Sequence, residues 1–417
     1  MIKKIYRHFM TDPLYQNSIY IMASTFILAI LGFVFWIFIA KLYDVETVGI
    51  ATTLISIMTL ISSFSLLGLN VGLIRYLPKS SVRNETITSS FILATLSTIL
   101  ITSAFFFGLN IFSPKLLFLQ KNYFYFVSFS IFMIGATFNI LIESIFMAYR
   151  AASNILLKNT VLSILKLCFP FFFISFGSYG IFTATALATL LSVIISCGIL
   201  VFRYNYKPAL VFNTTAVKVM AFFSGGNYIA GFLSQAPTLI LPLLIINYLH
   251  SATAAYYYVD AMILNLLVII PLATTQSLLT EGSYNSALLR EHTIKTVKII
   301  FLLLIPAILI IFFFGNILLN FFGKTYEAEA FAFLKIISVS AIFMAISLIG
   351  NAILKIRHQI KTLIVMSLLS FIFGLGFPYL FIPHGLAGVG WGWLLGQCIL
   401  AIAYLFMLRK EVASVRN

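Results

Sequence analysis

The feature that most constrains this chain is a series of long apolar runs separated by short polar gaps. A helix needs about 20 apolar residues to cross the roughly 30 Å hydrocarbon core of a bilayer. Twelve runs meet this length, near 17–40, 46–74, 86–112, 122–148, 154–177, 179–202, 217–247, 252–279, 293–319, 328–354, 359–382 and 384–408. Only 9% of the 417 residues are charged, whereas a soluble domain averages about 25%. We therefore expect an all-α polytopic membrane protein.

Lysine and arginine residues lie mostly in alternate gaps, and this distribution predicts the orientation. Of the 26 such residues, 20 lie in the two tails and in the gaps after even-numbered runs. Four lie in gaps on the opposite side: Lys41, Lys115, Lys121 and Lys324. Because cationic loops remain preferentially in the cytoplasm, we expect both termini in the cytoplasm and the protein in the cell membrane. The net charge of +15 then reflects topology, and we predict no nucleic-acid partner.

Segments of the two halves resemble each other at an offset of slightly more than 200 positions. Small residues recur at every fourth position in both "YGIFTATALA" (Gly180, Ala184, Ala188) and "AGVGWGWLLG" (Gly388, Gly392, Gly396). Such stripes allow close helix packing, although membrane helices are generally rich in glycine and alanine. Two further pairs fit nearly the same offset: 40–50 with 246–256, and 149–159 with 352–362. Together they predict six-helix bundles over residues 1–210 and 211–417, with a substrate cavity at their interface.

Four ionisable side chains fall well inside the apolar runs: Glu143, Lys166, Asp260 and Lys335. Such groups cost at least ~2.5–3.5 kcal/mol at a helix centre and normally face a protein interior or a cavity. From the helical rise per residue, Glu143 and Lys166 are expected at similar depths near the inner face. Asp260 and Lys335 are expected together near the outer face. They form structural ion pairs, or they line a wet cavity in which cations attract an anionic substrate and carboxylates couple ions or protons.

Polar residues near these charges are further candidates for a binding site. The amides Asn70, Asn139 and Gln235 could donate hydrogen bonds to a polar ligand or could only link helices. Arg75 follows an apolar run in "LGLNVGLIRYLPKS". It serves either as a positive anchor at the inner membrane face or as a ligand for phosphate, which a guanidinium grips at two oxygens.

Several chemical signatures are missing from the sequence. It has no GxxxxGK[ST] phosphate loop, no HExxH motif and no Cys/His cluster, so we predict no cofactor and no metal site. No gap between apolar runs is long enough for a separate catalytic domain. We therefore expect a protein that is not an enzyme and has no catalytic residue.

The N-terminal quarter carries a resemblance to a known family. The segments "AKLYDVETVGIA" and "LGLNVGLIRYLP", together with Asn17, Gly32 and Trp36 in the first run, resemble the polysaccharide transporter family of the MOP superfamily. "FMAYRAASN" is a weaker match. The family comprises Wzx-type flippases of lipid-linked oligosaccharides.

The resemblance implies two six-helix bundles around a central, cationic cavity, with alternating access. The substrate would be an undecaprenyl-diphosphate-linked sugar unit for O-antigen, capsule or exopolysaccharide. The partners would be this lipid-linked oligosaccharide, membrane lipids, and a polysaccharide polymerase and chain-length regulator. Arg75 and Lys166 would bind the diphosphate, although the chain has few buried cations for such a cavity.

Other functions compete with this interpretation. A cation-coupled drug or metabolite exporter would share the superfamily fold. A membrane-embedded polysaccharide polymerase or ligase would be expected to carry a large outer loop, and the sequence has none. A structural scaffold would not require buried charges at two depths.

Overall fold

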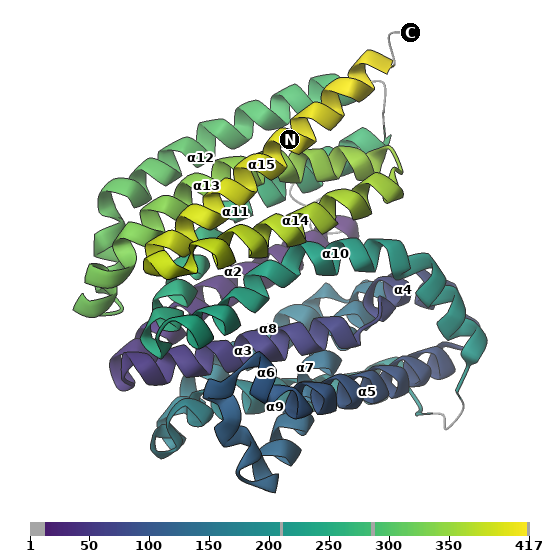
Figure 1. Ribbon diagram of the computed structural model, residues 1–417. Coiled ribbons are helices and arrows are strands. Elements are labelled where there is room, and N and C mark those ends of the chain that lie inside the picture. The colour runs from purple at the N-terminus through teal and green to yellow at the C-terminus, as the bar shows by residue number, and fades with distance from the viewer. Residues whose placement is uncertain (1–12, 209–211, 285–287, 415–417) are drawn as a thin grey trace, which may run out of the picture. The chain divides into compact units, whose positions relative to one another are not determined.

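The computed structural model describes residues 13–208, 212–284 and 288–414, and every regular element within these ranges is a helix (Figure 1). Eleven helical segments among them are long and apolar enough to cross a membrane. The last of these segments, Ile360–Met407, contains two helices, α14 (Ile360–Phe381) and most of α15 (Gly385–Ser414). The predicted fold class, an all-α polytopic membrane protein, is therefore confirmed.

The chain divides into two compact units between Tyr228 and Ile229, inside helix α10 (Thr214–Tyr248). The other helices of the first unit are α2 (Pro13–Leu42), α3 (Val45–Ser65), α4 (Leu69–Tyr76), α5 (Arg83–Phe107), α6 (Leu109–Phe112), α7 (Tyr123–Ala148), α8 (Ala152–Cys168) and α9 (Gly177–Tyr204). The second unit continues from α10 with α11 (Ser251–Tyr284), α12 (Leu289–Asn320), α13 (Lys324–Ile356), α14 and α15.

The sequence suggested one continuous helix over the second apolar run, but the structure divides this run into two helices. Helix α3 ends at Ser65, and the chain turns through Leu67 (φ 49°) and Gly68 (φ 81°) before α4 begins. A Cβ atom at Gly68 would lie 2.9 Å from the Ser224 Cβ atom of α10. Glycine is therefore favoured here both by the left-handed backbone and by the close approach of another helix.

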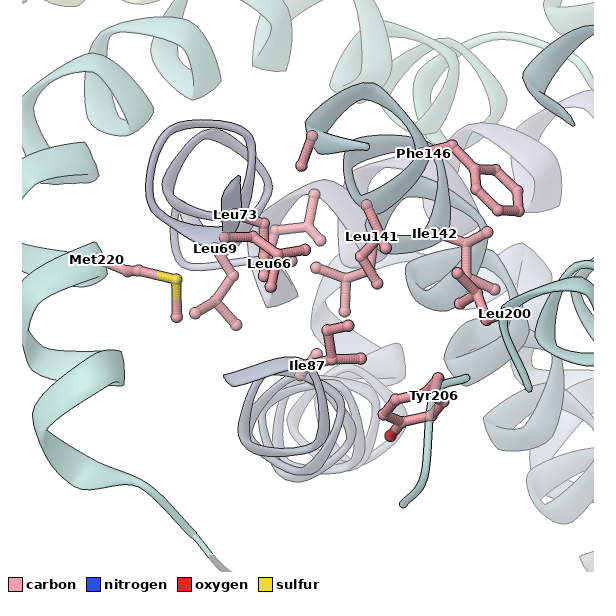
Figure 2. Packing of buried hydrophobic residues seen from close by; sticks show 14 of the residues in the cluster. Leu66, Leu69, Leu73, Ile87, Leu141, Ile142, Phe146, Leu200, Tyr206 and Met220 are labelled. Atoms are coloured by element: carbon pink, nitrogen blue, oxygen red, sulfur yellow. The ribbon is translucent and has the colours of Figure 1, made fainter. Parts of the chain in front are cut away.

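Apolar side chains next to this break form a buried core in the first unit (Figure 2). They come from the α3–α4 region, α5, α7, α9 and α10, and Figure 2 labels Leu66, Leu69, Leu73, Ile87, Leu141, Ile142, Phe146, Leu200, Tyr206 and Met220. The core fixes one end of α7, the helix that carries two of the predicted site residues. In the second unit, a separate core joins Ala230 of α10 to residues of α13, α14 and α15.

Corresponding helices pack in the same way in both units. In the first unit α7 packs against α5 and α9, and α8 packs against α2 and α9. In the second unit α13 packs against α12 and α15, and α14 packs against α15 and α10. In the described part of the chain, these five helices therefore have the same neighbours in both units.

The turns repeat as closely as the helices. Helices α7 and α13 end at Ala148 and Ile356, which are 208 positions apart. At the same offset, Arg150 (φ 53°) and His358 (φ 56°) adopt the left-handed conformation. The backbone N–H that follows each of them donates to a carbonyl five residues earlier, a pattern typical of a Schellman helix end. The pairing of 149–159 with 352–362 is therefore wrong by five residues, and the correct partner of 149–159 is 357–367.

The predicted glycine stripe brings α15 against α14. Cβ atoms at Gly392 and Gly396 would lie 2.5 Å and 2.7 Å from the carbonyl oxygens of Phe377 and Phe373, and a Cβ atom at Gly388 would collide with that of Phe381. Gly180 meets the Phe173 carbonyl in the same way, again at an offset of 208. The close approach predicted from small residues is confirmed at these positions.

Candidate functional site

A buried ammonium group lies between helices α7 and α8 of the first unit. The Lys158 Nζ atom is 3.0 Å from Glu143 Oε2 and donates to Asn139 Oδ1 at 2.7 Å and to the Asn139 carbonyl at 3.3 Å. Asn139 and Glu143 are four residues apart on α7, so they lie on one helix face. The Lys158 side chain is 0% exposed, whereas that of Glu143 is 33% exposed. The pair is thus closed on the lysine side and open on the carboxylate side.

The sequence had suggested that Glu143 pairs with Lys166. In the structure it pairs with Lys158 instead. The expected pairing took Lys158 to be at the membrane face and measured the depth of Lys166 from it. In the structure α8 begins at Ala152, six residues before Lys158, and α7 ends at Ala148, five residues after Glu143. Antiparallel neighbours with these spacings place Lys158 and Glu143 at the same level, and Lys166 lies about 12 Å farther along α8.

Lys166 lies among aromatic rings of the first unit. Its Nζ atom is 4.4 Å from the Phe35 ring centroid and 5.7 Å from that of Trp36, both on α2. Phe35 and Trp36 are 1% and 3% exposed. Among the described residues, no carboxylate lies within ion-pair distance of Lys166. Its positive charge is therefore stabilised by the faces of aromatic rings and not neutralised.

The expected pair between Asp260 and Lys335 does not form. Asp260 on α11 is fully buried, and neither of its carboxylate oxygens has a hydrogen-bond partner among the described residues. The Lys335 Nζ atom on α13 lies 4.0 Å and 5.0 Å from the ring centroids of Phe331 and Phe312. Residues at similar depth on adjacent helices pair only when they also face each other, and Lys335 is turned toward α12.

A small cavity in the second unit lies beside the helix that carries Asp260. It has a volume of about 30 Å³, and its lining includes Tyr257, Ala261 and Trp393. The buried Trp393 Nε1 atom has no acceptor among the described residues. The volume is sufficient for a water molecule, which would satisfy this donor.

The remaining predicted site residues lie on helices α4 and α10. Arg75 is exposed in the last turn of α4, with its guanidinium 5.9 Å from the Tyr76 ring centroid. On the same helix Gly72 packs closely against α10, because a Cβ there would lie 2.7 Å from Met220 Cβ. Asn70 has a buried Oδ1 atom without a partner in the described part of the chain. Gln235 is exposed on α10.

Comparison with models of known families assigns the chain to one of them. The family model described as "Polysaccharide biosynthesis protein" matches residues 14–280, which is more than half of the chain. The chain belongs to the polysaccharide biosynthesis protein family. No curated protein matches it.

Solved structures of membrane transporters share the fold of this family member. The lipid II flippase MurJ in an inward closed conformation matches with a TM-score of 0.78 and 13% identity, over 94% of this chain and 87% of that one. An inward-facing multidrug resistance MATE family transporter of the MOP superfamily matches with a TM-score of 0.73 and 18% identity, over 93% and 95%. An outward-facing one has a TM-score of 0.66 at 17% identity, over 98% of both chains. These likenesses establish a MOP-type transporter fold.

The two lysines of α8 in this polysaccharide biosynthesis protein have no lysine at the equivalent positions of the repeat. At the offset of 208, the positions of Lys158 and Lys166 hold Met366 and Gly374. Met366 belongs to the apolar core of the second unit, and Gly374 packs against Pro237. The site in the first unit therefore has no charged counterpart at the equivalent positions of the second.

The same comparison applies to the buried carboxyl group of the second unit. Helices α3 and α11 begin 206 positions apart, at Val45 and Ser251. At that offset Asp260 corresponds to Leu54, which is fully buried. Neither charged site follows from the repeated architecture, so each is an addition to it.

Lys158 is the site residue that the sequence analysis missed. It was counted among the cations of a cytoplasmic gap, although it lies inside the fifth apolar run. Its spacing from Asn159 and Ser163 provides the missed signal, because these three residues share the buried side of α8. Among the described residues, no group of three or more His, Cys, Asp or Glu side chains could hold a metal ion.

Proposed function

We propose that this protein is a flippase that moves a diphosphate-linked lipid oligosaccharide across the cytoplasmic membrane for the synthesis of a cell-surface polysaccharide. Membership of the polysaccharide biosynthesis protein family supports the pathway. The likeness to the fold of MurJ, a lipid II flippase, supports the kind of movement. Such movement makes and breaks no covalent bond, so the proposed role requires no catalytic residue.

The unneutralised charge of Lys166 is the observation that carries this proposal. A diphosphate cannot cross hydrocarbon without compensation of its charge. Lys158 is already neutralised by Glu143, whereas Lys166 faces aromatic rings and has no carboxylate within ion-pair distance among the described residues. A partly buried cation without a counter-ion among the described residues favours an anionic ligand. Lys166 is therefore the proposed diphosphate ligand, whereas Asn139 is bound by Lys158, which lies about 12 Å from Lys166 along α8.

The proposed cycle is alternating access between bundles formed by residues 1–210 and 211–417, around a central cavity. Asp260 is the proposed coupling residue, because its carboxyl group is fully buried and has no hydrogen-bond partner among the described residues, and ionisable groups inside a membrane commonly serve ion or proton pathways. Arg75 is proposed to receive the diphosphate at the cytoplasmic face, and both termini lie in the cytoplasm. A polymerase and a chain-length regulator are the proposed downstream partners.

A cation-coupled drug exporter is the second candidate, favoured by the likeness to MATE transporters. The two functions require opposite charges at the substrate site. An exporter of cations needs an accessible carboxylate, and a flippase of diphosphates needs an accessible cation. Glu143, the more exposed partner of its pair, is the carboxylate that an exporter would use, and transport of a cationic dye by the wild-type protein distinguishes the two functions.

Complementation of a flippase-deficient strain tests the proposal, with surface glycan and membrane abundance measured together. We expect Lys166→Met to abolish surface glycan and Lys166→Arg to retain part of it. Lys41→Met, at an exposed position near the end of α2, is the matched control and should remain active. Normal glycan in Lys166→Met would exclude the proposed diphosphate site.

A further inference from the structure

An open apolar groove runs between helices α8 and α9 of the first unit. Its volume is about 420 Å³, and it is lined by Asn154, Leu157, Ile195, Gly198, Ile199, Phe202 and Arg203. The side chains of Leu157, Ile195 and Phe202 are 48%, 44% and 88% exposed. In a membrane, an exposed groove of this composition is in contact with lipid chains rather than water.

Gly198 keeps this groove open. A Cβ atom added there would meet nothing within 4 Å, so the absence of a side chain leaves real space on the helix surface. At the offset of 208, the second unit carries Phe406, which is 67% exposed. A phenylalanine at the Gly198 position would occupy the groove, so the groove is a feature that the first unit does not share with its repeat.

One end of the groove carries a cation, and side-chain contacts hold that end in place. Arg203 lines the groove in the last turn of α9. The adjacent Tyr204 ring stacks on Tyr149 with centroids 4.9 Å apart, and its hydroxyl accepts from Asn154 Nδ2 at 3.0 Å. Arg150, the residue after Tyr149, is also exposed. The stacked tyrosines therefore hold the end of α9, which carries Arg203, against the turn that carries Arg150.

We propose that this groove is a binding site for an anionic phospholipid. One acyl chain lies against Gly198 between the two helices, and the phosphate is bound by Arg203. Basic pockets between transmembrane helices recognise anionic headgroups in this way. A guanidinium can grip two phosphate oxygens at once, which makes Arg203 better suited than a lysine to such a headgroup. The lining on α9 runs from Ile195 to Arg203, a rise of about 12 Å along the helix, which suits part of one acyl chain.

Native mass spectrometry of the full chain tests this site, with phosphatidylglycerol and phosphatidylcholine of identical chains as probes. The wild type should bind phosphatidylglycerol more tightly. Arg203→Gln should weaken phosphatidylglycerol binding about fivefold and leave phosphatidylcholine binding unchanged. Gly198→Phe should weaken the binding of both lipids, because the ring fills the space for the chain.

Gly376→Phe on α14 is the matched control, since its Cβ position is also open, and it should bind both lipids as the wild type does. Arg203→Gln adds no bulk, so it decides the question even if Gly198→Phe fails to fold. Equal phosphatidylglycerol affinity in Arg203→Gln and the wild type would overturn the proposal. Displacement of phosphatidylglycerol by undecaprenyl phosphate, beyond that caused by more phosphatidylglycerol, would also overturn it by assigning the groove to a substrate tail.

Discussion

At the scale of single residues, the contact of Lys158 with Glu143 and Asn139 determines how the first unit tolerates charge. Breaking a buried ion pair by removing one partner costs about 3–5 kcal/mol, because an uncompensated charge remains. We expect Glu143→Gln and Lys158→Met each to lower thermal stability in detergent strongly, and the double substitution to do less harm than Glu143→Gln alone. The exposed pair Glu291–Lys295 is the control, and its loss should leave the thermal stability nearly unchanged, because solvent screens such pairs. Additive effects at the buried pair would contradict this account.

Arg75 gives a second prediction at this scale. If it only marks the inner face, any cation suffices, and Arg75→Gln should be mild because Lys79 and Arg83 remain nearby. If it binds the diphosphate, Arg75→Lys should lose much of the transport and Arg75→Gln nearly all of it. Surface glycan, compared at equal membrane abundance, distinguishes the two. Normal glycan in Arg75→Gln would leave only the anchoring role.

Asp44, just before α3, gives a prediction about pH. Its carboxylate accepts from the Thr47 hydroxyl at 2.7 Å and from the Thr47 N–H at 2.9 Å. These hydrogen bonds hold the pKa of Asp44 below its ordinary value of 3.8. A lowered pKa contributes stability that is complete above the unfolded value and is lost as the pH falls through the folded one. Asp44→Ala should therefore lower the free energy of unfolding near neutral pH by about 1 kcal/mol, through loss of helix capping, and so lower the melting temperature. The difference from the wild type should shrink below pH 3.8. A difference independent of pH would contradict the role of the charge.

At the scale of helices, the contact between α14 and α15 depends on the absence of side chains. The Cβ of Gly392→Ala would lie 2.5 Å from the Phe377 carbonyl oxygen, so the helices must separate. Overpacking of this kind costs about 1–3 kcal/mol. Gly376→Ala, where a Cβ meets nothing within 4 Å, should instead be neutral or stabilising by up to about 1 kcal/mol. Equal melting temperatures of the two variants would show that the glycine stripe does not control this packing.

Helices and their close contacts could be predicted because apolar length and small-residue spacing depend on local sequence. The partner of Glu143 was missed because Lys158 was taken to lie at the membrane face, whereas it lies six residues inside α8, which begins at Ala152. The orientation of Lys335 toward Phe312 depends on the rotation of α13 about its axis, which depth estimates do not contain. The five-residue error in the repeat has a similar origin, because few residues of the two turns are alike although their backbones are.

At the scale of the whole molecule, the distribution of lysine and arginine predicts the topology. With 20 of 26 positive residues assigned to one side, reporter fusions after Arg203 and at the C-terminus should report the cytoplasm. A fusion near Lys121 should report the outer side. Although Lys158 proves to be buried and does not belong in that count, the remaining asymmetry is large enough to leave the expectation unchanged. Opposite reports from these fusions would reverse the proposed direction of substrate entry.

The central claim is that a lipid carrying a diphosphate-linked sugar crosses the bilayer through this protein. Its most direct test is a proteoliposome assay with a fluorescent short-chain diphosphate-linked oligosaccharide, in which a membrane-impermeant reductant quenches only the outer leaflet. We expect wild-type protein to expose the inner-leaflet probe rapidly, and Lys166→Met to slow this about tenfold or more, as loss of a charged hydrogen bond implies. The account would be contradicted if wild-type vesicles lost no more fluorescence than protein-free vesicles while the same protein transported a cationic dye.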